Sequence, residues 1–299
     1  MLRVAVIGGS NGQLARSLSE TADAGCMVSL LGRPQVDLAE PAGLPEMLSG
    51  LLRDLAPQIV VNAAAYTAVD RAESEPDAAF RINRDGAAAV AQACAALGLP
   101  LVHVSTDYVF DGSGDRPWRE DDACAPTGIY GRSKLEGERA VQAALPAAVI
   151  LRTAWVHSPF GGNFVKTMLR LAGERDRLRV VADQQGCPTY APDLAAAILT
   201  LAQRRVAAPD DPALGGIFHL AGSGATSWFG LAGEVMTVSA RLGGPHRPVD
   251  PITTADYPTP ARRPANSVLD CSRIDAAYGI RLPDWHAGVA RCVARLLDT

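Results

Sequence analysis

The chain has 299 residues, of which 48% are hydrophobic and 20% are charged, and its formal net charge at pH 7 is −4. These proportions are typical of a soluble globular protein, and the lack of a basic stripe argues against nucleic acid as a partner. The six cysteines form no C-x-x-C pair and no apolar stretch approaches a membrane span, so we expect reduced thiols, no metal, no membrane association and a cytoplasmic location.

The first half of the chain alternates short β-branched segments with Ala- and Leu-rich segments. This rhythm predicts parallel strands joined by crossover helices. We expect strands at residues 4–7, 27–31, 58–61, 101–104 and 147–152. We expect helices at residues 13–20, 44–55, 77–97 and 131–143. The predicted fold class is therefore α/β, a Rossmann-type doubly wound parallel sheet.

The second half is less regular. Residues 111–127 form a Gly-, Pro- and Asp-rich loop, and residues 245–266 are Pro-rich and irregular. The remaining expected elements are strands at 178–181 and 217–220 and helices at 164–173, 192–203, 227–242 and 283–297. We predict a cofactor-binding domain at 1–154, to which a segment near 174–195 returns. Residues 155–299 mainly form a smaller, discontinuous α/β substrate-binding lobe.

A glycine turn follows the first predicted strand and opens the first helix. Gly9, Gly12 and Ala15 give the pattern G-x-x-G-x-x-A. Glycine lets a pyrophosphate approach the backbone, and the helix N-terminus offers free N–H groups to the phosphates. The pattern predicts a dinucleotide site, although a turn without a ligand has the same glycines. The residues predicted to contact the cofactor here are Gly9, Asn11, Gly12, Gln13 and Leu14.

Arg33 bears on the choice of cofactor. An NAD site expects an acidic residue where the second strand ends, and here that position reads Leu31-Gly32-Arg33. A guanidinium matches the geometry of a 2′-phosphate. We therefore predict a preference for NADPH, with NADH use and a merely solvated Arg33 as the alternatives.

Tyr130 and Lys134 form a Y-x-x-x-K pair near the start of a predicted helix. Residues four apart share a helix face, and a neighbouring cation lowers the pKa of a phenol. The pair therefore predicts a general acid or base. Thr106 lies just past the end of the fourth predicted strand, where ligands bind in open α/β sheets. We expect its hydroxyl to bind a substrate carbonyl oxygen beside Tyr130.

Together these motifs resemble the extended short-chain dehydrogenase/reductase superfamily. Further stretches are similar to one member family, the dTDP-4-dehydrorhamnose reductases, and cover nearly the whole chain. They lie at residues 12–14, 61–70, 105–112, 130–138, 152–156, 163–168, 183–189 and 257–264. The resemblance implies reduction of the C4 keto group of dTDP-4-dehydro-β-L-rhamnose by NADPH. This reaction would belong to dTDP-rhamnose biosynthesis, which supplies cell-surface polysaccharide.

The resemblance also implies roles for individual residues. Tyr130 would be the general acid, Lys134 its partner, and Thr106 the ligand of the keto oxygen. Four residues would surround the sugar, namely Thr67, Val69, Asp107 and Trp155. Asn62, Ala63 and Ala64 would follow the cofactor, and Asp37 and Leu38 would lie near its adenine.

Some positions depart from the family pattern. Ala15 replaces the commoner third glycine, Ala154 replaces a common serine, and Cys187 fills a variable position. Some members are associated with a divalent ion held by glutamates, which we do not place in this chain. Another nucleotide-sugar 4-ketoreductase, an epimerase, and a non-catalytic NADP-binding regulatory subunit stay as alternative functions. A homodimer is one possible assembly.

Overall fold

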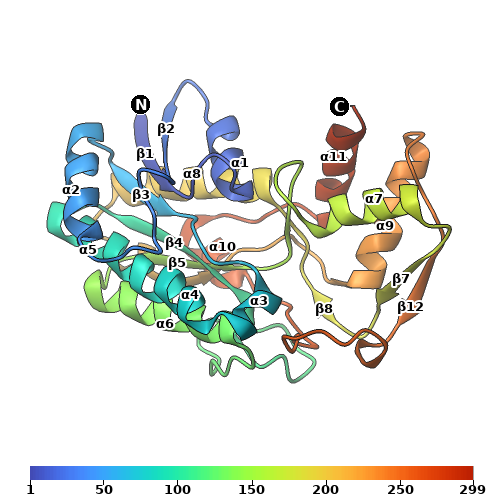
Figure 1. Ribbon diagram of the computed structural model, residues 1–299. Coiled ribbons are helices and arrows are strands. Elements are labelled where there is room, and N and C mark those ends of the chain that lie inside the picture. The colour runs from blue at the N-terminus through green and yellow to red at the C-terminus, as the bar shows by residue number, and fades with distance from the viewer. Residues whose placement is uncertain (299) are drawn as a thin grey trace.

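The computed structural model describes residues 1–298, and a six-stranded parallel sheet lies at the centre of its larger group of elements (Figure 1). Its strand order is β10-β5-β4-β3-β1-β2. The strands are β1 (Leu2–Ile7), β2 (Cys26–Leu31), β3 (Ile59–Asn62), β4 (Leu101–Thr106), β5 (Val149–Thr153) and β10 (Gly216–His219). The order reverses between β1 and β3, which is where a doubly wound sheet binds its ligand. The predicted α/β class is confirmed.

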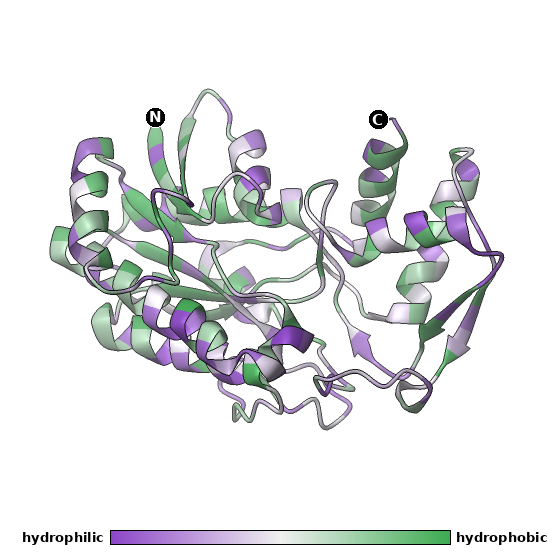
Figure 2. Cartoon of the chain, in the orientation of Figure 1, coloured by the Kyte–Doolittle hydropathy of each residue, from purple (hydrophilic) through white to green (hydrophobic). Residues whose placement is uncertain are grey.

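Helices cover both faces of this sheet because its strands alternate their side chains between two apolar layers. In β1, Val4 and Val6 pack with helices α1 (Gln13–Thr21) and α8 (Ala191–Ala207). Ala5 and Ile7 pack on the opposite face with α2 (Leu44–Leu55), α5 (Ala87–Leu97) and α6 (Ile129–Ala144). Figure 2 shows the apolar strands between helices whose outer surfaces are more polar.

A second, smaller group of elements has its own core. Its helices are α7 (Phe164–Glu174), α9 (Trp228–Arg241) and α11 (Trp285–Leu297), and its strands β7 (Leu178–Val181) and β12 (Val249–Ile252) pair in parallel. Two further pairs of two-residue strands are β6 (Val156–His157) with β9 (Thr189–Tyr190) and β8 (Gln185–Gly186) with β11 (Thr226–Ser227). The short helix α10 (Ser272–Tyr278) packs on β10 of the main sheet. Figure 1 shows this group beside the main sheet, next to the carboxyl ends of its strands.

The chain passes between the two groups more than once. Within the 174–195 segment, β7 pairs with β12 outside the main sheet. The later elements that join the layers of the main sheet are α8, which packs on α1, and β10, which pairs with β5. The division into 1–154 and 155–299 stays a proposal.

Most expected elements are found within two or three residues of their predicted bounds, and three features differ. The helix expected at 77–97 is split into α4 (Pro76–Phe80), a π-helical turn η1 (Arg81–Gly86) and α5. The Pro-rich stretch expected to be irregular contains β12, whose Pro251 lies in an edge strand, where proline is tolerated. Two helices were not predicted, α3 (Val69–Ser74) and α10.

No helix among residues 1–298 is both long enough and apolar enough to cross a membrane.

Candidate active site

The glycine turn directly follows β1 and is held against β2. The backbone N–H groups of Gly8 and Gly9 both point to the carbonyl of Leu31, at 2.9 and 3.2 Å. Gly9 has a φ of +65°, and a Cβ on Gly32 would lie 2.4 Å from the Gly9 Cα. The turn therefore requires glycine for its conformation and for close approach of two backbone segments.

Helix α1 begins at this turn with free backbone donors. Its N-cap is Gly12, which provides no side-chain acceptor for the N–H groups of the first helical turn. Ala15 is buried, and a Cβ on Gly8 would already lie 3.2 Å from the Ala15 Cβ. The departure from glycine at position 15 is thus accommodated, and the turn fits a pyrophosphate group.

Gln13 binds the second group of elements. Its side-chain oxygen accepts hydrogen bonds from Ser158 Oγ at 2.8 Å and from Asn163 Nδ2 at 3.0 Å. Asn11 lies close to the same loop, because a Cβ on Gly161 would be 3.7 Å from the Asn11 carbonyl oxygen. Leu14 is buried in the core below. The structure therefore leaves the Gln13 side-chain oxygen engaged within the protein.

The residues predicted to meet the adenosine end lie after β2. Arg33 is exposed. The Asp37 carboxylate accepts the backbone N–H of Ala39 at 3.0 Å, and Leu38 is buried against Gly86. A guanidinium at the sheet edge beside the glycine turn fits a 2′-phosphate.

The predicted cofactor contacts Asn62, Ala63 and Ala64 lie at the end of β3, beside the end of β1. Ile7 of β1 is level with Asn62 of β3, and Asn62 is level with His103 of β4. The backbone N–H of Ala63 donates to the Ile7 carbonyl at 2.8 Å, which places 62–64 next to the glycine turn. Asn62 is fully buried, while Ala63 and Ala64 are partly exposed.

Tyr130 and Thr106 meet at the carboxyl end of β4, and Lys134 lies one helical turn after Tyr130 on α6. The Tyr130 phenol hydrogen-bonds the Thr106 side chain, and Lys134 Nζ donates to the carbonyl of Val104 at 2.8 Å. Helix α6 can approach this closely because Gly131 has no side chain; a Cβ there would lie 2.1 Å from the Tyr108 carbonyl oxygen. The structure thus brings Tyr130 and Thr106 together and places the Lys134 amine against the backbone of the same strand, at Val104.

The electrostatics of Tyr130 and Lys134 differ from the expectation. Burial raises the pKa of Tyr130 to about 12, because the hydrogen bond with Thr106 only partly offsets the desolvation of the phenolate. Burial also lowers the pKa of Lys134 to about 8. In this structure the amine binds the Val104 carbonyl, and burial outweighs any lowering of the phenol pKa by a neighbouring cation.

Thr106 and Asp107 form a second polar contact at this site. Thr106 Oγ1 donates to Asp107 Oδ1 at 2.9 Å and accepts the backbone N–H of Tyr108 at 3.3 Å. Burial raises the pKa of Asp107 to about 6, against the lowering effect of its hydrogen bonds. A carboxyl group therefore lies next to the hydroxyl that is predicted to bind the substrate.

The other predicted sugar contacts come from both groups of elements. Thr67 is exposed and Val69 is partly exposed at the start of α3. Trp155 has a φ of +47°, rare for a residue with a side chain. Its indole stacks on Trp228 with ring centroids 3.5 Å apart and lies against Gly186. Trp228, for which we predicted no site role, is thus part of the same aromatic pair.

Three contacts that position α6 and the segment after β3 were not predicted from the sequence. Glu73 Oε1 accepts the backbone N–H of Ile129 at 2.8 Å and so caps α6, the helix of Tyr130. Asn83 binds both the backbone of Tyr66 and the Ser133 hydroxyl. The acidic side chain of Glu73 is compatible with a helix N-cap, but the sequence does not indicate that the capped helix is α6.

A fourth such contact lies beneath the site. Glu138 of α6 and Arg152 of β5 form a buried ion pair at 2.7 Å. Ser105 Oγ also donates to the Glu138 carboxylate. This pair ties the helix of Lys134 to the sheet, and the sequence showed only that both residues lie in family-like stretches.

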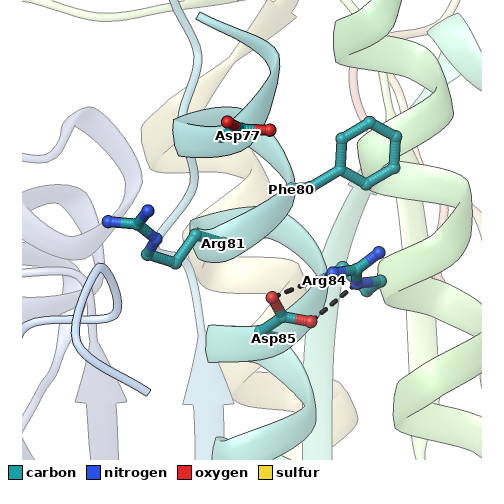
Figure 3. Close-up of a pocket in the computed structure, with 5 residues that line it drawn as sticks. All are labelled: Asp77, Phe80, Arg81, Arg84 and Asp85. Atoms are coloured by element: carbon teal, nitrogen blue, oxygen red, sulfur yellow. Dashed lines mark hydrogen bonds and ion pairs between the residues drawn. The ribbon is translucent and has the colours of Figure 1, made fainter. Parts of the chain in front are cut away.

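A separate surface pocket of about 320 Å³ lies on α4 and η1, and its lining residues are Asp77, Phe80, Arg81, Arg84 and Asp85 (Figure 3). Arg84 forms a two-bond ion pair with Asp85, while Arg81 extends to the other side of the helix. None of these residues belongs to the glycine turn or to the predicted catalytic residues.

The chain is similar to known proteins over nearly its whole length. A family model described as the RmlD substrate binding domain matches residues 3–297. A dTDP-4-dehydrorhamnose reductase from Sinorhizobium fredii is 51% identical over 99% of this chain and 98% of its own. That of Escherichia coli K12 is 44% identical over 88% of this chain and 86% of its own. The Bacillus anthracis enzyme, solved in complex with NADP, is 33% identical with a TM-score of 0.88, covering 99% of this chain and 100% of its own.

Proposed function

The chain belongs to the dTDP-4-dehydrorhamnose reductase family, and from that premise we propose that it uses NADPH to reduce the C4 keto group of dTDP-4-dehydro-β-L-rhamnose, giving dTDP-β-L-rhamnose. The family makes it an NADP-dependent oxidoreductase. The observation that carries the proposed chemistry is the meeting of Tyr130 and Thr106 at the end of β4, two strands from the glycine turn.

The dinucleotide supplies a hydride to the keto carbon when it is bound. The protein must then place a proton on the alkoxide oxygen. A phenol with a pKa of about 12 is fully protonated at neutral pH, so Tyr130 is a proton donor in this direction. The Thr106 hydroxyl lies next to it and would hold the keto oxygen in place.

The residues around the glycine turn would hold the cofactor. Gly9, Gly12 and the first N–H groups of α1 suit the pyrophosphate, and exposed Arg33 suits the 2′-phosphate. We assign the remaining cofactor contacts to Asn11, Leu14, Asp37, Leu38, Asn62, Ala63 and Ala64, and to Gln13 through its backbone.

Residues from both groups of elements would surround the sugar. Thr67 and Val69 come from the segment after β3, and Asp107 from the end of β4. Trp155 lies at the start of the second group, stacked on Trp228.

The enzyme is proposed to act in the cytoplasm as a monomer or homodimer. Sedimentation velocity would distinguish the two states of assembly.

Replacing the phenol tests this proposal directly. Tyr130→Phe should bind NADPH as the wild type does and lose a factor of about 10² or more in kcat, because the proton donor is removed. NADPH consumption with a panel of nucleotide-linked 4-ketosugars measures this. The matched control is Tyr278→Phe, which removes a hydroxyl bonded to the Leu214 carbonyl, away from the site.

Two results would contradict the proposal. Near-normal turnover in Tyr130→Phe would remove Tyr130 from the mechanism. Tightly held, non-exchanging NAD without net consumption of NADPH would indicate an epimerase instead.

A further inference from the structure

A buried polar chain runs from the end of β3 through β4 to α6. Asn62, His103 and Lys134 are at most 1% exposed. Asn62 Nδ2 lies 3.2 Å from His103 Nδ1, and His103 Nε2 lies 3.5 Å from Lys134 Nζ. Lys134 Nζ also donates to the Val104 carbonyl at 2.8 Å. The proposed reaction gives His103 no role.

The side-chain amide of Asn62 is fixed in one orientation. The backbone N–H of Ala64 points to Asn62 Oδ1 at 3.2 Å, and an N–H requires an acceptor. Turning the amide over would set its NH₂ group against that N–H and leave a donor unsatisfied. The NH₂ group of Asn62 therefore faces His103 Nδ1 and donates to it.

This donor fixes the tautomer of His103. Burial holds the pKa of His103 well below its usual value, so the ring is neutral. A neutral imidazole has one N–H group and one acceptor nitrogen. Because Nδ1 accepts from Asn62, the hydrogen is on Nε2 and points at Lys134 Nζ.

An ammonium group cannot accept that hydrogen, because it has three donors and no lone pair. A neutral amine can accept it and still donate to the Val104 carbonyl. Building on the proposed reductase function, we propose that His103, locked in its Nε2–H tautomer by Asn62, is a positioning residue that favours the neutral amine of Lys134 in the ligand-free enzyme. His103 thereby sets the pH at which Lys134 takes up its proton.

The other ionisable groups around Lys134 do not prevent His103 from shifting the pKa of its amine. On α6, Glu138 favours the ammonium, but its carboxylate is shared with Arg152 of β5 and Ser105 of β4. Tyr130, one turn earlier, is neutral because its pKa is about 12. Burial lowers the pKa of Lys134 to about 8, so the titration falls in an accessible range.

The sequence makes Lys134 directly observable, since the chain has only two lysines, Lys134 and Lys166. Protein labelled with ¹³C,¹⁵N-lysine should give two side-chain NMR signals, and Lys166→Arg assigns them. In His103→Gln the amide oxygen can turn to the ammonium, so the pKa of Lys134 should rise by about one unit. His103→Asn, which lacks the atom facing Lys134, should raise it in the same direction.

The control is His219→Gln, which alters a buried histidine on β10, two strands away, and should leave the Lys134 titration unchanged. In wild-type protein labelled with ¹⁵N-histidine, the signals lost in His103→Gln should show Nε2 protonated. Equal Lys134 titration in the wild type and in a folded His103 variant would overturn the proposal, as would the Nδ1–H tautomer.

Kinetics give an independent readout. The pH profile of kcat/KM reports groups of the free enzyme, and its alkaline limb should move up by about one pH unit in His103→Gln. An unmoved alkaline limb in an active His103→Gln enzyme would contradict the role of His103. Absence of ketosugar reduction in the wild type would refute the proposed function instead, and the NMR titration would still decide the role of His103.

Discussion

Arg33 is exposed where β2 ends, beside the glycine turn, and it is the residue we expect to select the cofactor. Arg33→Ala should raise the KM for NADPH about tenfold or more, because a charge-assisted hydrogen bond to phosphate is lost. The KM for NADH, which has no 2′-phosphate, should change little. Steady-state kinetics with both cofactors measure the ratio.

The control for this change is Arg53→Ala, which removes the same charge from an exposed position on α2. An equal change in the KM of both cofactors in Arg33→Ala would show that Arg33 does not contact the 2′-phosphate.

The contact between Tyr130 and Thr106 was predictable from the sequence, whereas the electrostatics of Tyr130 and Lys134 were not. The four-residue spacing of Tyr130 and Lys134 sets both on one helix face, and the strand end sets Thr106 nearby. The sequence does not show that the Lys134 amine binds the Val104 carbonyl or how deeply the phenol is buried. These depend on how closely α6 packs on β4, which Gly131 permits.

At the scale of elements, α6 depends on a cap from a distant part of the chain. Glu73 accepts the backbone N–H of Ile129, the residue before Tyr130. Glu73→Ala should lower the free energy of unfolding by about 1 kcal/mol, as loss of an N-cap does, and should also lower kcat by loosening the first turn of α6. Thermal unfolding and NADPH consumption measure the two effects.

Glu73→Gln provides the matched control, because its side-chain oxygen can still accept the Ile129 N–H. The conservative variant should therefore retain most of the stability and activity. If Glu73→Ala unfolds at the wild-type temperature with wild-type kcat, this cap contributes nothing.

Regular elements were predictable where local pattern and burial agree. The strands β1 to β5 and helix α2 follow from continuous apolar runs and helical periodicity. The π-helical turn η1 does not, because contacts outside the segment accompany it. Gly86 packs against Leu38, and the Asn83 carbonyl lies where a Cβ of Gly137 would be. The pairing of β12 with β7 likewise joins residues about 70 positions apart.

At the scale of the molecule, an ion pair ties the 257–264 segment to α3. Arg263 binds both carboxylate oxygens of Asp70, at 2.8 and 3.0 Å, and the N–H of Ala261 binds one of them. Partial burial opposes ionisation of Asp70, but these hydrogen bonds outweigh it and hold its pKa below the usual value. The contact is therefore present above the unfolded pKa and is lost as the pH falls through the folded one.

Asp70→Asn should loosen this segment at neutral pH. The amide of Ala261 should exchange roughly fivefold faster, a modest factor because the pair is partly exposed and screened by solvent. Hydrogen exchange followed by mass spectrometry measures this. Asp250→Asn, which breaks an exposed pair with Arg177, is the control and should leave the segment unchanged. Equal exchange in Asp70→Asn and the wild type would contradict the role of the ion pair.

The topology also limits how this protein can be divided. A polypeptide ending at residue 154 would lack β10, which pairs with β5, and α8, which packs on α1. Its apolar Val149, Leu151 and Leu18 would then face water. We expect such a fragment to aggregate or to bind the dye ANS, which soluble yield and fluorescence would reveal. Recombination with a relative could therefore not exchange the second group of elements as one continuous segment, and a folded hybrid would need crossovers at several junctions.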